Sequence, residues 1–409
     1  MAYWNPEIET MPIAELKALQ LKNLKALVRR LYDNSPFYRQ RMQQQGVTPD
    51  AVRTLEDAVK LPFMHKKDLR DYYPDKLFVA SRREIVRYHA SSGTTGKATI
   101  VGYTRNDIES WSESLARALT SIGLGAEDVI QVSNTYGLFT GGLGFHYAAE
   151  KIGAAVVPAS TGNTERQIQL IQDLGVTAMA ATPSYMIYVG EVAEKMGISI
   201  KNDTKLRVGL LGAEPWSDGM RDRIQDWLGV KGINCYGASE LAGPLFSECA
   251  DQQGIHFWSD LTMLTKEAFP LIRYRIGDIS IMHEDKCSCG RTHPRLSRIT
   301  GRVDDMLIIR GINVFPSQVE YSLLTNPELG NEFQIVIDRK GALDDMLVRV
   351  ELKPEAFTDN INQLNALRER VEGKLKNLLN VGAEIELVEP GSLPRFEGKA
   401  KRVVDRRTY

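Results

Sequence analysis

The stretch Val208-Gly209-Leu210-Leu211-Gly212-Ala213-Glu214-Pro215 joins a short apolar run to a loop of small and acidic residues. A run of this length, bounded by turn residues, predicts a buried strand. The loop lies just past the carboxyl end of that strand, which is where ligands bind in open parallel sheets. The stretch therefore predicts an α/β fold with a binding site at the edge of its sheet.

The same alternation extends to both sides of this stretch. Segments of helical period occupy residues 107–121, begin near Thr164 and begin again at Pro183. The other short apolar runs are Val129–Val132, Ala154–Val157, Ala178–Ala181 and Ile233–Tyr236. Buried strands that alternate with helices indicate a parallel or mostly parallel sheet. The segment Tyr236-Gly237-Ala238-Ser239-Glu240 comes at the end of the last run, so we expect it at the same sheet edge.

The pattern changes after about residue 302, where the order of helices and strands becomes that of a small α+β unit. The expected helices are 316–325 and 359–379, and the expected strands are 334–338, 346–352 and 384–388. A unit of this size can fold as a domain. We therefore expect an N-terminal domain over residues 1–301, a hinge at 302–305 and a C-terminal domain over residues 306–409.

Length and composition exclude several classes of protein. With 409 residues the chain is too long for one compact core, and 43% hydrophobic with 25% charged residues is typical of a soluble globular protein. The formal net charge of −1 provides no general attraction to nucleic acid or to an anionic membrane. No apolar run reaches membrane-spanning length, and the first residues lack the pattern of a signal peptide. Four cysteines do not make a disulfide framework, so we expect a reducing cytoplasm.

Residues 14–33 are amphipathic, with leucines near helical spacing and basic residues between them. Such a segment lies either on a membrane surface or against the main domain, and the second arrangement is the more common.

The loop Ser91-Ser92-Gly93-Thr94-Thr95-Gly96-Lys97 is dense in backbone N–H and hydroxyl donors. Glycine has no Cβ, so a loop of this kind can approach a polyphosphate closely, and the lysine adds a positive charge. The order of residues is not that of a Walker loop. A polar surface turn is the alternative interpretation, and the heptamer alone does not decide between the two.

Several motifs stand in one order along nearly the whole chain. They are the 91–97 loop, Gly212–Pro215, Tyr236–Glu240, Tyr274–Asp278, Gly301–Asp305 and Pro394–Lys399. This order resembles the adenylate-forming superfamily of acyl-CoA synthetases. Residues 89–97, 264–274 and 308–316 look particularly like its phenylacetate–CoA ligase and aryl-CoA ligase subgroup.

The resemblance implies both a fold and a reaction. The fold is a large N-terminal domain of mostly parallel sheets flanked by helices, with a β-rich subdomain, and a small mobile α+β C-terminal domain. The reaction is that of an AMP-forming acid–thiol ligase. A carboxylate attacks the α-phosphate of ATP to give an acyl adenylate and pyrophosphate, and the thiol of coenzyme A then displaces AMP. The implied requirements are an aryl carboxylic acid, ATP, Mg²⁺ and coenzyme A, and a homodimer is compatible with the family.

The resemblance also implies roles for single residues. Lys399 would stabilise the charge that develops at the α-phosphate, and Asp304 would be the hinge. Glu240 would bind Mg²⁺, Asp278 would accept hydrogen bonds from the ribose, and Arg302 would contact ribose or phosphate. The nucleotide site would comprise Ser91, Ser92, Gly93, Thr94, Thr95, Gly96, Lys97, Gly212, Ala213, Glu214, Pro215, Tyr236, Gly237, Ala238, Ser239, Asp278 and Arg302. Taken alone, Glu240, Asp278 and Lys399 also match a surface glutamate, a turn aspartate and a solvated lysine.

Residues 134–147 combine aromatic side chains with many glycines, a composition that suits a pocket for an aromatic ring. The candidate lining residues are Tyr136, Phe139, Ala213, Gly237 and Pro244. The alternative is a glycine-rich loop that enters a core helix. The candidate lining residues include no basic side chain that could bind a second carboxylate, so a monocarboxylic aryl acid is favoured. Phenylacetate fits, and indoleacetate and benzoate derivatives fit as well.

Four residues offer ligands for a structural zinc ion. Cys249, His256, Cys287 and Cys289 provide three sulfurs and an imidazole, a set that suits tetrahedral Zn²⁺. The spacing of one residue within the Cys287–Cys289 pair is shorter than usual. The alternative is two unpaired cysteines in a hairpin turn and a surface histidine. Cys235, behind a strand, is expected to pack as a small apolar residue.

The chain departs from the family pattern after Trp258, where a strand-pair segment of the β-rich subdomain is missing. The expected β-rich part around residues 256–282 therefore follows the family pattern least closely. Two other functions fit the motifs. One is adenylation followed by transfer to an amine, a carrier-protein thiol or a deazaflavin cofactor. The other is a degenerate adenylate-binding protein, against which the presence of Lys399, Asp278 and Glu240 argues.

Overall fold

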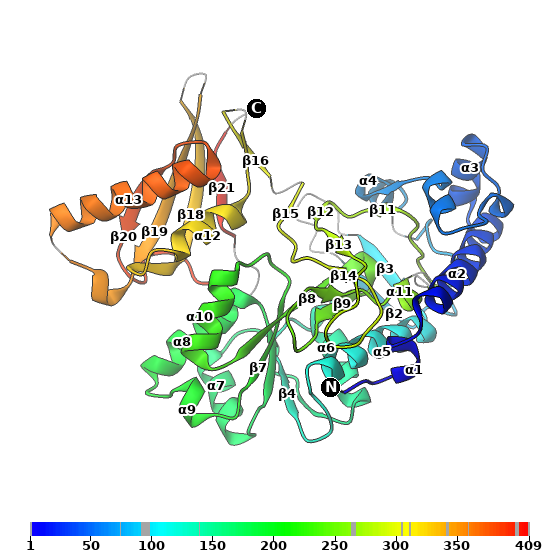
Figure 1. The fold of residues 1–409 in the computed structure, drawn as a ribbon, viewed down its shortest axis with the longest axis horizontal. Coiled ribbons are helices and arrows are strands. Elements are labelled where there is room, and N and C mark those ends of the chain that lie inside the picture. The colour runs from blue at the N-terminus through cyan, green and yellow to red at the C-terminus, as the bar shows by residue number, and fades with distance from the viewer. Residues whose placement is uncertain are drawn as a thin grey trace.

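The computed structural model describes residues 2–73, 75–90, 99–138, 140–262, 267–303, 306–310, 312–340, 343–358, 360–396 and 401–407. Among these residues, the largest sheet has nine strands in the order β13-β14-β10-β9-β8-β7-β6-β4-β5 (Figure 1). These strands are β4 (Val129–Val132), β5 (Ala155–Val157), β6 (Ala178–Ala181), β7 (Val208–Gly212), β8 (Lys231–Ala238), β9 (Gly243–Glu248), β10 (Ile255–His256), β13 (Met282–His283) and β14 (Arg295–Leu296). Every apolar run in the predicted alternation forms one of them.

The sheet has a parallel half and an antiparallel half. Strands β5, β4, β6, β7 and β8 pair in parallel, whereas β9, β10, β14 and β13 follow in antiparallel order. The direction reverses at the turn between β8 and β9, where the short helix η3 (Ser239–Leu241) is followed by Ala242 and Gly243 at φ 107° and 82°. The carboxyl ends of the five parallel strands therefore lie at one edge, as the pattern predicts.

Helices cover both faces of the parallel half. They are α5 (Arg105–Ser121), α6 (Gly141–Lys151), α7 (Thr164–Asp173), α8 (Pro183–Lys195), α9 (Ile200–Asp203) and α10 (Asp218–Leu228). Alternate strand residues face different helices, because successive side chains of a strand point to opposite faces. Met179 and Leu211 belong to the core with α7, α8 and α10, whereas Ala180 and Leu210 belong to the core with α5 and α6.

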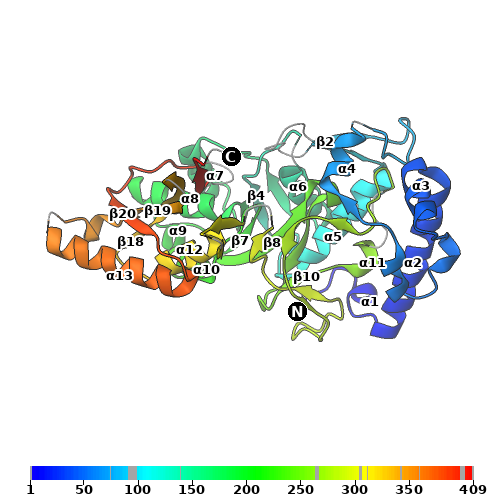
Figure 2. The same ribbon diagram turned by 90° about the horizontal axis from the view of Figure 1, so that it is seen from above.

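The N-terminal part adds helices at one end of the molecule (Figures 1 and 2). They are α1 (Pro6–Glu9), α2 (Ile13–Asn34), α3 (Pro36–Gln44), η1 (Pro49–Ala51), η2 (Glu56–Lys60) and α4 (Lys66–Asp71). The apolar face of α2 is buried through Leu16, Leu24 and Leu31, so the amphipathic segment packs on the domain. None of the helices in the described part of the chain combines the length and apolar character needed to cross a membrane.

The β-rich part is built from very short strands. They are β1 (Met64–His65), β2 (Arg87–Ala90), β3 (Ile100–Tyr103), β11 (Tyr274–Arg275), β12 (Asp278–Ile279) and β15 (Gly301–Arg302), with the helix α11 (Ser259–Thr262) after β10. Strand β1 pairs with β11, β2 with β3, and β12 with β15. The described residues between β10 and β14 hold only two-residue strands, in the region where the sequence departs from the family pattern.

The C-terminal part has its own core. Its elements are β16 (Leu307–Ile309), β17 (Ile312–Val314), α12 (Pro316–Leu324), β18 (Leu329–Lys340), β19 (Leu343–Leu352), η4 (Pro354–Ala356), α13 (Ile361–Leu379), β20 (Glu384–Val388) and β21 (Val403–Asp405). The sheet order is β20-β19-β18-β21, and α12 and α13 pack on it. Strands β16, β17 and β21 were not expected. The predicted division at residues 302–305 stays a prediction, and Asp304 lies outside the described residues.

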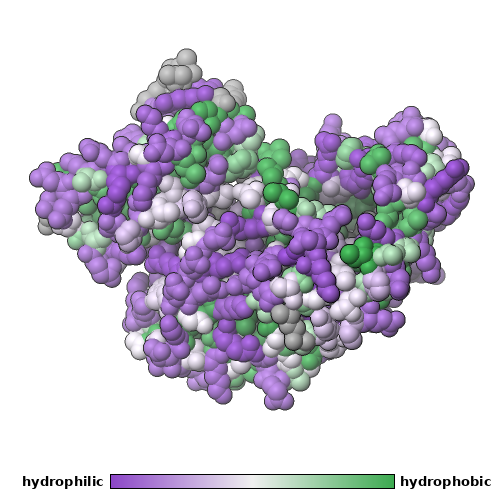
Figure 3. Space-filling model, viewed as in Figure 1, coloured by the Kyte–Doolittle hydropathy of each residue, from purple (hydrophilic) through white to green (hydrophobic). Residues whose placement is uncertain are grey.

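The surface shown in Figure 3 is mostly hydrophilic, with hydrophobic residues in small separate groups.

Candidate functional site

The loop after β7 is held at the sheet edge by steric and polar constraints. Gly212 pairs with Cys235 of β8, and a Cβ at Gly212 would lie 2.3 Å from the carbonyl oxygen of Cys235. Only glycine fits there without moving the backbone. Ala213 follows at φ 70°, and the Glu214 carboxylate accepts a 2.8 Å hydrogen bond from the Ser184 N–H at the start of α8. The loop is thus fixed beside the end of β8.

Three predicted nucleotide-site residues meet in one cluster at this edge. The Tyr236 hydroxyl donates a 2.6 Å hydrogen bond to the carboxylate of Asp278. Asp278 lies opposite Arg302 in the β12–β15 pair, and the guanidinium of Arg302 forms an ion pair with Asp278. Arg302 also donates to the carbonyl oxygen of Ile276 at 3.2 Å. The cluster therefore joins the central sheet to the last strand before the C-terminal part.

Burial and charge keep the Tyr236 hydroxyl protonated. Burial raises the pKa of Tyr236 well above its usual range, and the adjacent negative charge of Asp278 raises this pKa further. The Asp278 side chain is only 8% exposed, against 23% for Arg302. A buried carboxylate held by a hydroxyl and a guanidinium has a fixed position, and its two oxygens can accept further hydrogen bonds from a diol.

Glu240, the predicted magnesium ligand, lies in η3 between β8 and β9 and is buried. Its carboxylate accepts a 3.4 Å hydrogen bond from the Tyr274 hydroxyl. Burial and the charge of Glu240 raise the pKa of Tyr274 beyond its usual range, so Tyr274 remains a donor. The Tyr103 hydroxyl donates to the carbonyl oxygen of Ser239 at 3.1 Å and steadies the same turn. A buried carboxylate oxygen fits a hard cation such as Mg²⁺.

A cavity of about 340 Å³ lies between the two parts of the chain and is lined by residues of both. One wall contains Glu214, Pro215 and Arg302, and the other contains Glu320, Lys401 and Arg402 together with apolar residues. The sheet-edge residues of the first wall thus face the C-terminal part across this cavity.

Four predicted regions lie outside the described residues. They are the loop Ser91–Lys97, Phe139, Asp304 and Lys399. The chain on either side of the loop is described, since Ala90 of β2 pairs with Ile100 of β3. The Ala90 N–H donates to the carbonyl oxygen of Leu138 at 2.8 Å, which ties this hairpin to the 134–138 segment.

The candidate acyl-pocket residues are only partly brought together. Gly237 pairs with Pro244, and a Cβ at Gly237 would overlap the Gly243 carbonyl oxygen at 1.6 Å. Tyr136 is half-buried, and its hydroxyl lies 3.1 Å from Nδ1 of His146 in α6. A Cβ at Gly144 would lie 2.7 Å from the Trp111 ring, so this glycine serves packing between α5 and α6. The segment is thus in part the glycine-rich entry to a core helix, and the pocket assignment stays a prediction.

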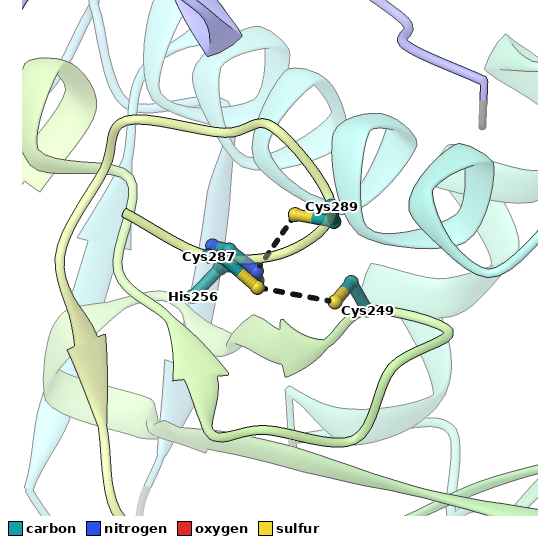
Figure 4. Close-up of side chains that lie close together, drawn as sticks. All are labelled: Cys249, His256, Cys287 and Cys289. Carbon is teal, nitrogen blue, oxygen red and sulfur yellow. Dashed lines mark hydrogen bonds between the residues drawn. The ribbon is translucent and has the colours of Figure 1, made fainter. Parts of the chain in front are cut away.

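The four candidate zinc ligands converge. The side-chain donor atoms of Cys249, His256, Cys287 and Cys289 all lie within 4.8 Å of one another, and all four residues are buried (Figure 4). Cys235 is elsewhere, in the core of the main sheet, as expected for a small apolar residue.

Ser184, Glu320 and a second cavity are features of the structure that were not predicted from the sequence. Glu320 of α12 is buried at the interdomain cavity, and burial raises its pKa to about 7. The second cavity, of about 410 Å³, lies between α2, α5 and β9 and includes Trp111, Phe246 and Glu267. Nothing in the local sequence distinguishes these residues from ordinary helix and core residues. Tyr274 did stand inside a recognised motif.

Comparisons with known proteins show the family to which the chain belongs. The family model described as AMP-binding enzyme matches residues 26–267, and the model described as AMP-binding enzyme C-terminal domain matches residues 311–407. The chain is 43% identical to a phenylacetate-coenzyme A ligase of Thermus thermophilus, with 99% of each chain covered. It is 42% identical to a phenylacetate-coenzyme A ligase of Escherichia coli K12, with 98% of this chain and 97% of the other covered. The Thermus alignment spans 443 positions against 409 residues here, so that relative has residues that this chain lacks.

A solved structure is similar over the whole length. It is 2-hydroxyisobutyryl-CoA ligase in the postadenylation state with 2-HIB-AMP, at a TM-score of 0.92 and 30% identity, covering 99% of this chain and 92% of that chain. The same ligase in the thioesterification state, with 2-HIB-AMP and CoA, gives a TM-score of 0.71 at 30% identity, covering 98% of this chain and 92% of that chain. Family models, relatives and solved structure agree, and the chain belongs to the AMP-binding enzyme family, with both its main and its C-terminal domain.

Proposed function

We propose that this protein is an ATP-dependent aryl-acid:CoA ligase that forms AMP through an acyl adenylate, with phenylacetate or a similar monocarboxylic aryl acid as substrate. The observation that carries the proposal is the placement of Tyr236, Asp278, Arg302 and Glu240 at one sheet edge. Relatives more than 40% identical over nearly the whole chain are named phenylacetate-coenzyme A ligases, which supports the substrate class.

Different residues would bind different parts of ATP. The Asp278 carboxylate accepts hydrogen bonds from the ribose hydroxyls, and Tyr236 with the 212–215 loop borders the adenine. Glu240 would hold Mg²⁺, which neutralises charge beside the phosphates. The substrate carboxylate oxygen attacks the α-phosphorus, and the bond to pyrophosphate breaks. Lys399 stabilises the charge that builds in this transition state. The sulfur of CoA then attacks the acyl carbonyl carbon, and AMP leaves.

The two half-reactions need two arrangements of the domains. The higher TM-score to the postadenylation state supports the proposal that the arrangement described here follows adenylation. In it, the Ser317 hydroxyl donates to the Thr300 carbonyl oxygen at 2.7 Å, and Arg395 lies 3.6 Å from the Glu191 carboxylate. Rotation about Asp304 would break both contacts and open the path for the thiol.

The proposal places the enzyme in the cytoplasm, which is supported by four unpaired cysteines that suit a reducing compartment.

A panel of carboxylates with ATP, Mg²⁺ and CoA tests the function, with AMP release and acyl-CoA mass as readouts. We expect an aryl acid such as phenylacetate to give equal amounts of AMP and acyl-CoA. Formation of acyl-AMP without any CoA-dependent product would instead favour transfer to another acceptor. Absence of ATP–pyrophosphate exchange with every acid would contradict an adenylating enzyme.

A further inference from the structure

The cysteine–histidine cluster joins two turns of the antiparallel half-sheet. Cys249 follows β9 and His256 is in β10, whereas Cys287 and Cys289 lie in the connection between β13 and β14. The segments therefore come from two neighbouring strand connections more than thirty residues apart in the chain. In Figure 4 the three sulfur atoms and the imidazole are turned toward one another.

The distances within the cluster fit a tetrahedral metal site. With Zn–S bonds of about 2.3 Å and Zn–N bonds of about 2.0 Å, the edges of the ligand tetrahedron are about 3.8 Å between sulfurs and about 3.5 Å between sulfur and nitrogen. The Cys249 and Cys287 sulfurs lie 3.9 Å apart, and the Cys289 sulfur lies 3.5 Å from Nε2 of His256.

The three cysteines form no disulfide, and the 3.9 Å between the Cys249 and Cys287 sulfurs is much longer than the about 2.0 Å between bonded sulfurs. Thiols that only fill apolar space need not converge with an imidazole nitrogen. We propose that Cys249, His256, Cys287 and Cys289 bind one structural Zn²⁺ ion, and that this ion holds the loop on which the N-terminal segment docks.

The loop that carries two of the ligands also binds residues near the start of the chain. The Tyr3 hydroxyl donates to the Cys289 carbonyl oxygen at 2.8 Å. Arg291 donates to the Glu9 carboxylate at 2.6 Å, and both side chains are fully buried. The Thr292 hydroxyl donates to the Met11 carbonyl oxygen at 2.7 Å.

A buried ion pair is stable only while its surroundings hold both partners in place, since a buried charge without its partner is costly. The Arg291–Glu9 pair depends on the position of the loop two residues before it, where Cys289 is a ligand. Loss of the metal would free this loop from the β9–β10 turn. The N-terminal segment would then lose its binding surface, while the C-terminal part would be unaffected.

The first test measures metal in the full-length protein purified without chelators. Inductively coupled plasma mass spectrometry should find one zinc ion per chain in the wild-type protein. It should find none in Cys289→Ser or Cys287→Ser. Cys235→Ser removes a buried thiol outside the cluster and is expected to keep one zinc. A wild-type protein with no zinc, or with another metal in its place, would overturn the proposal.

The second test reports the docking of the N-terminal segment. We expect hydrogen exchange over residues 2–11 to rise at least about tenfold in Cys289→Ser, with exchange in β18 and β19 unchanged. Should that variant fail to fold, a mercurial reagent applied to the wild-type protein releases zinc directly, and exchange is measured on the same sample. Unchanged exchange over residues 2–11 after zinc release would contradict the proposed role of the ion.

Discussion

The Tyr236 hydroxyl donates a 2.6 Å hydrogen bond to the Asp278 carboxylate, and this contact joins the end of β8 to β12. The residue proposed to border the adenine therefore also positions the carboxylate proposed to bind the ribose. Arg302 holds the opposite side of that carboxylate, so the position of Asp278 depends on two strands and on the approach to the C-terminal part.

Asp278→Asn should weaken ATP binding with little change in fold. The amide keeps the shape and can accept from Tyr236, but it loses the charge that strengthens the interaction with Arg302 and the proposed hydrogen bonds from the ribose. A hydrogen bond to a charged group contributes about 1.5–3 kcal/mol, which corresponds to a rise of roughly 10- to 150-fold in the KM for ATP. Pyrophosphate exchange measures this value. Tyr236→Phe serves as the milder comparison, and an unchanged KM in Asp278→Asn would contradict the assigned role.

Glu240→Gln should raise the Mg²⁺ concentration that gives half-maximal adenylation by at least about tenfold, because an amide oxygen is a weaker ligand for a hard cation than a carboxylate. Titration of activity with Mg²⁺ at saturating ATP measures the change. Glu165→Gln makes the same charge change on an exposed helix position and should leave the titration unaltered. Identical curves for the two variants would remove Glu240 from the metal site.

Gly212→Ala should destabilise the sheet edge, because its Cβ would meet the backbone carbonyl of Cys235 at 2.3 Å. Overpacking of this kind costs about 1–3 kcal/mol of unfolding free energy, and the displaced loop should also bind ATP less tightly. Gly373→Ala in α13 meets no atom within 4 Å and should stabilise the protein by up to about 1 kcal/mol. Denaturant unfolding of both variants checks the contrast, and equal stabilities would show that the edge tolerates a methyl group.

Glu320 should make stability depend on pH. Burial, opposed by Arg402 and reinforced by Glu214, raises its pKa from the ordinary 4.5 to about 7. Its contribution is therefore full below about pH 4.5 and is lost as the pH rises through about 7. We expect Glu320→Gln to melt at a higher temperature than the wild type at pH 8, and the difference to shrink toward pH 5. A difference in melting temperature that stays constant from pH 5 to pH 8 would show that Glu320 does not titrate in the folded protein.

The sequence pattern predicted the elements whose start, end and hydrogen bonds are determined by residues close together in the chain. Helix α8 begins at Pro183, as expected, because proline suits the first helical position and the Thr182 side chain caps the Tyr185 N–H. Strand β20 also has the predicted bounds, Glu384–Val388. Strands such as β12 and β15 are two residues long and arise from their pairing, which no local pattern reveals.

In the site, too, residues with a distinctive local pattern could be predicted, whereas residues that depend on distant segments could not. The zinc-ligand candidates could be found because three cysteines and a histidine have few other uses together. Glu320, Glu9 and Arg291 could not, because they are ordinary charged residues whose burial depends on segments distant in the chain. The 91–97 loop, Asp304 and Lys399 rest on the family resemblance.

The most direct test of the account separates the two half-reactions in Lys399→Ala. Adenylation is measured by pyrophosphate exchange, and thioester formation is measured from synthetic phenylacetyl-AMP and CoA. Lys376→Ala, an exposed lysine of α13, is the matched control. We expect Lys399→Ala to lose about 10²- to 10³-fold in the rate of adenylation while thioester formation continues, since the role proposed for the lysine is to stabilise only the first transition state. Adenylation at the rate of the control would contradict the account.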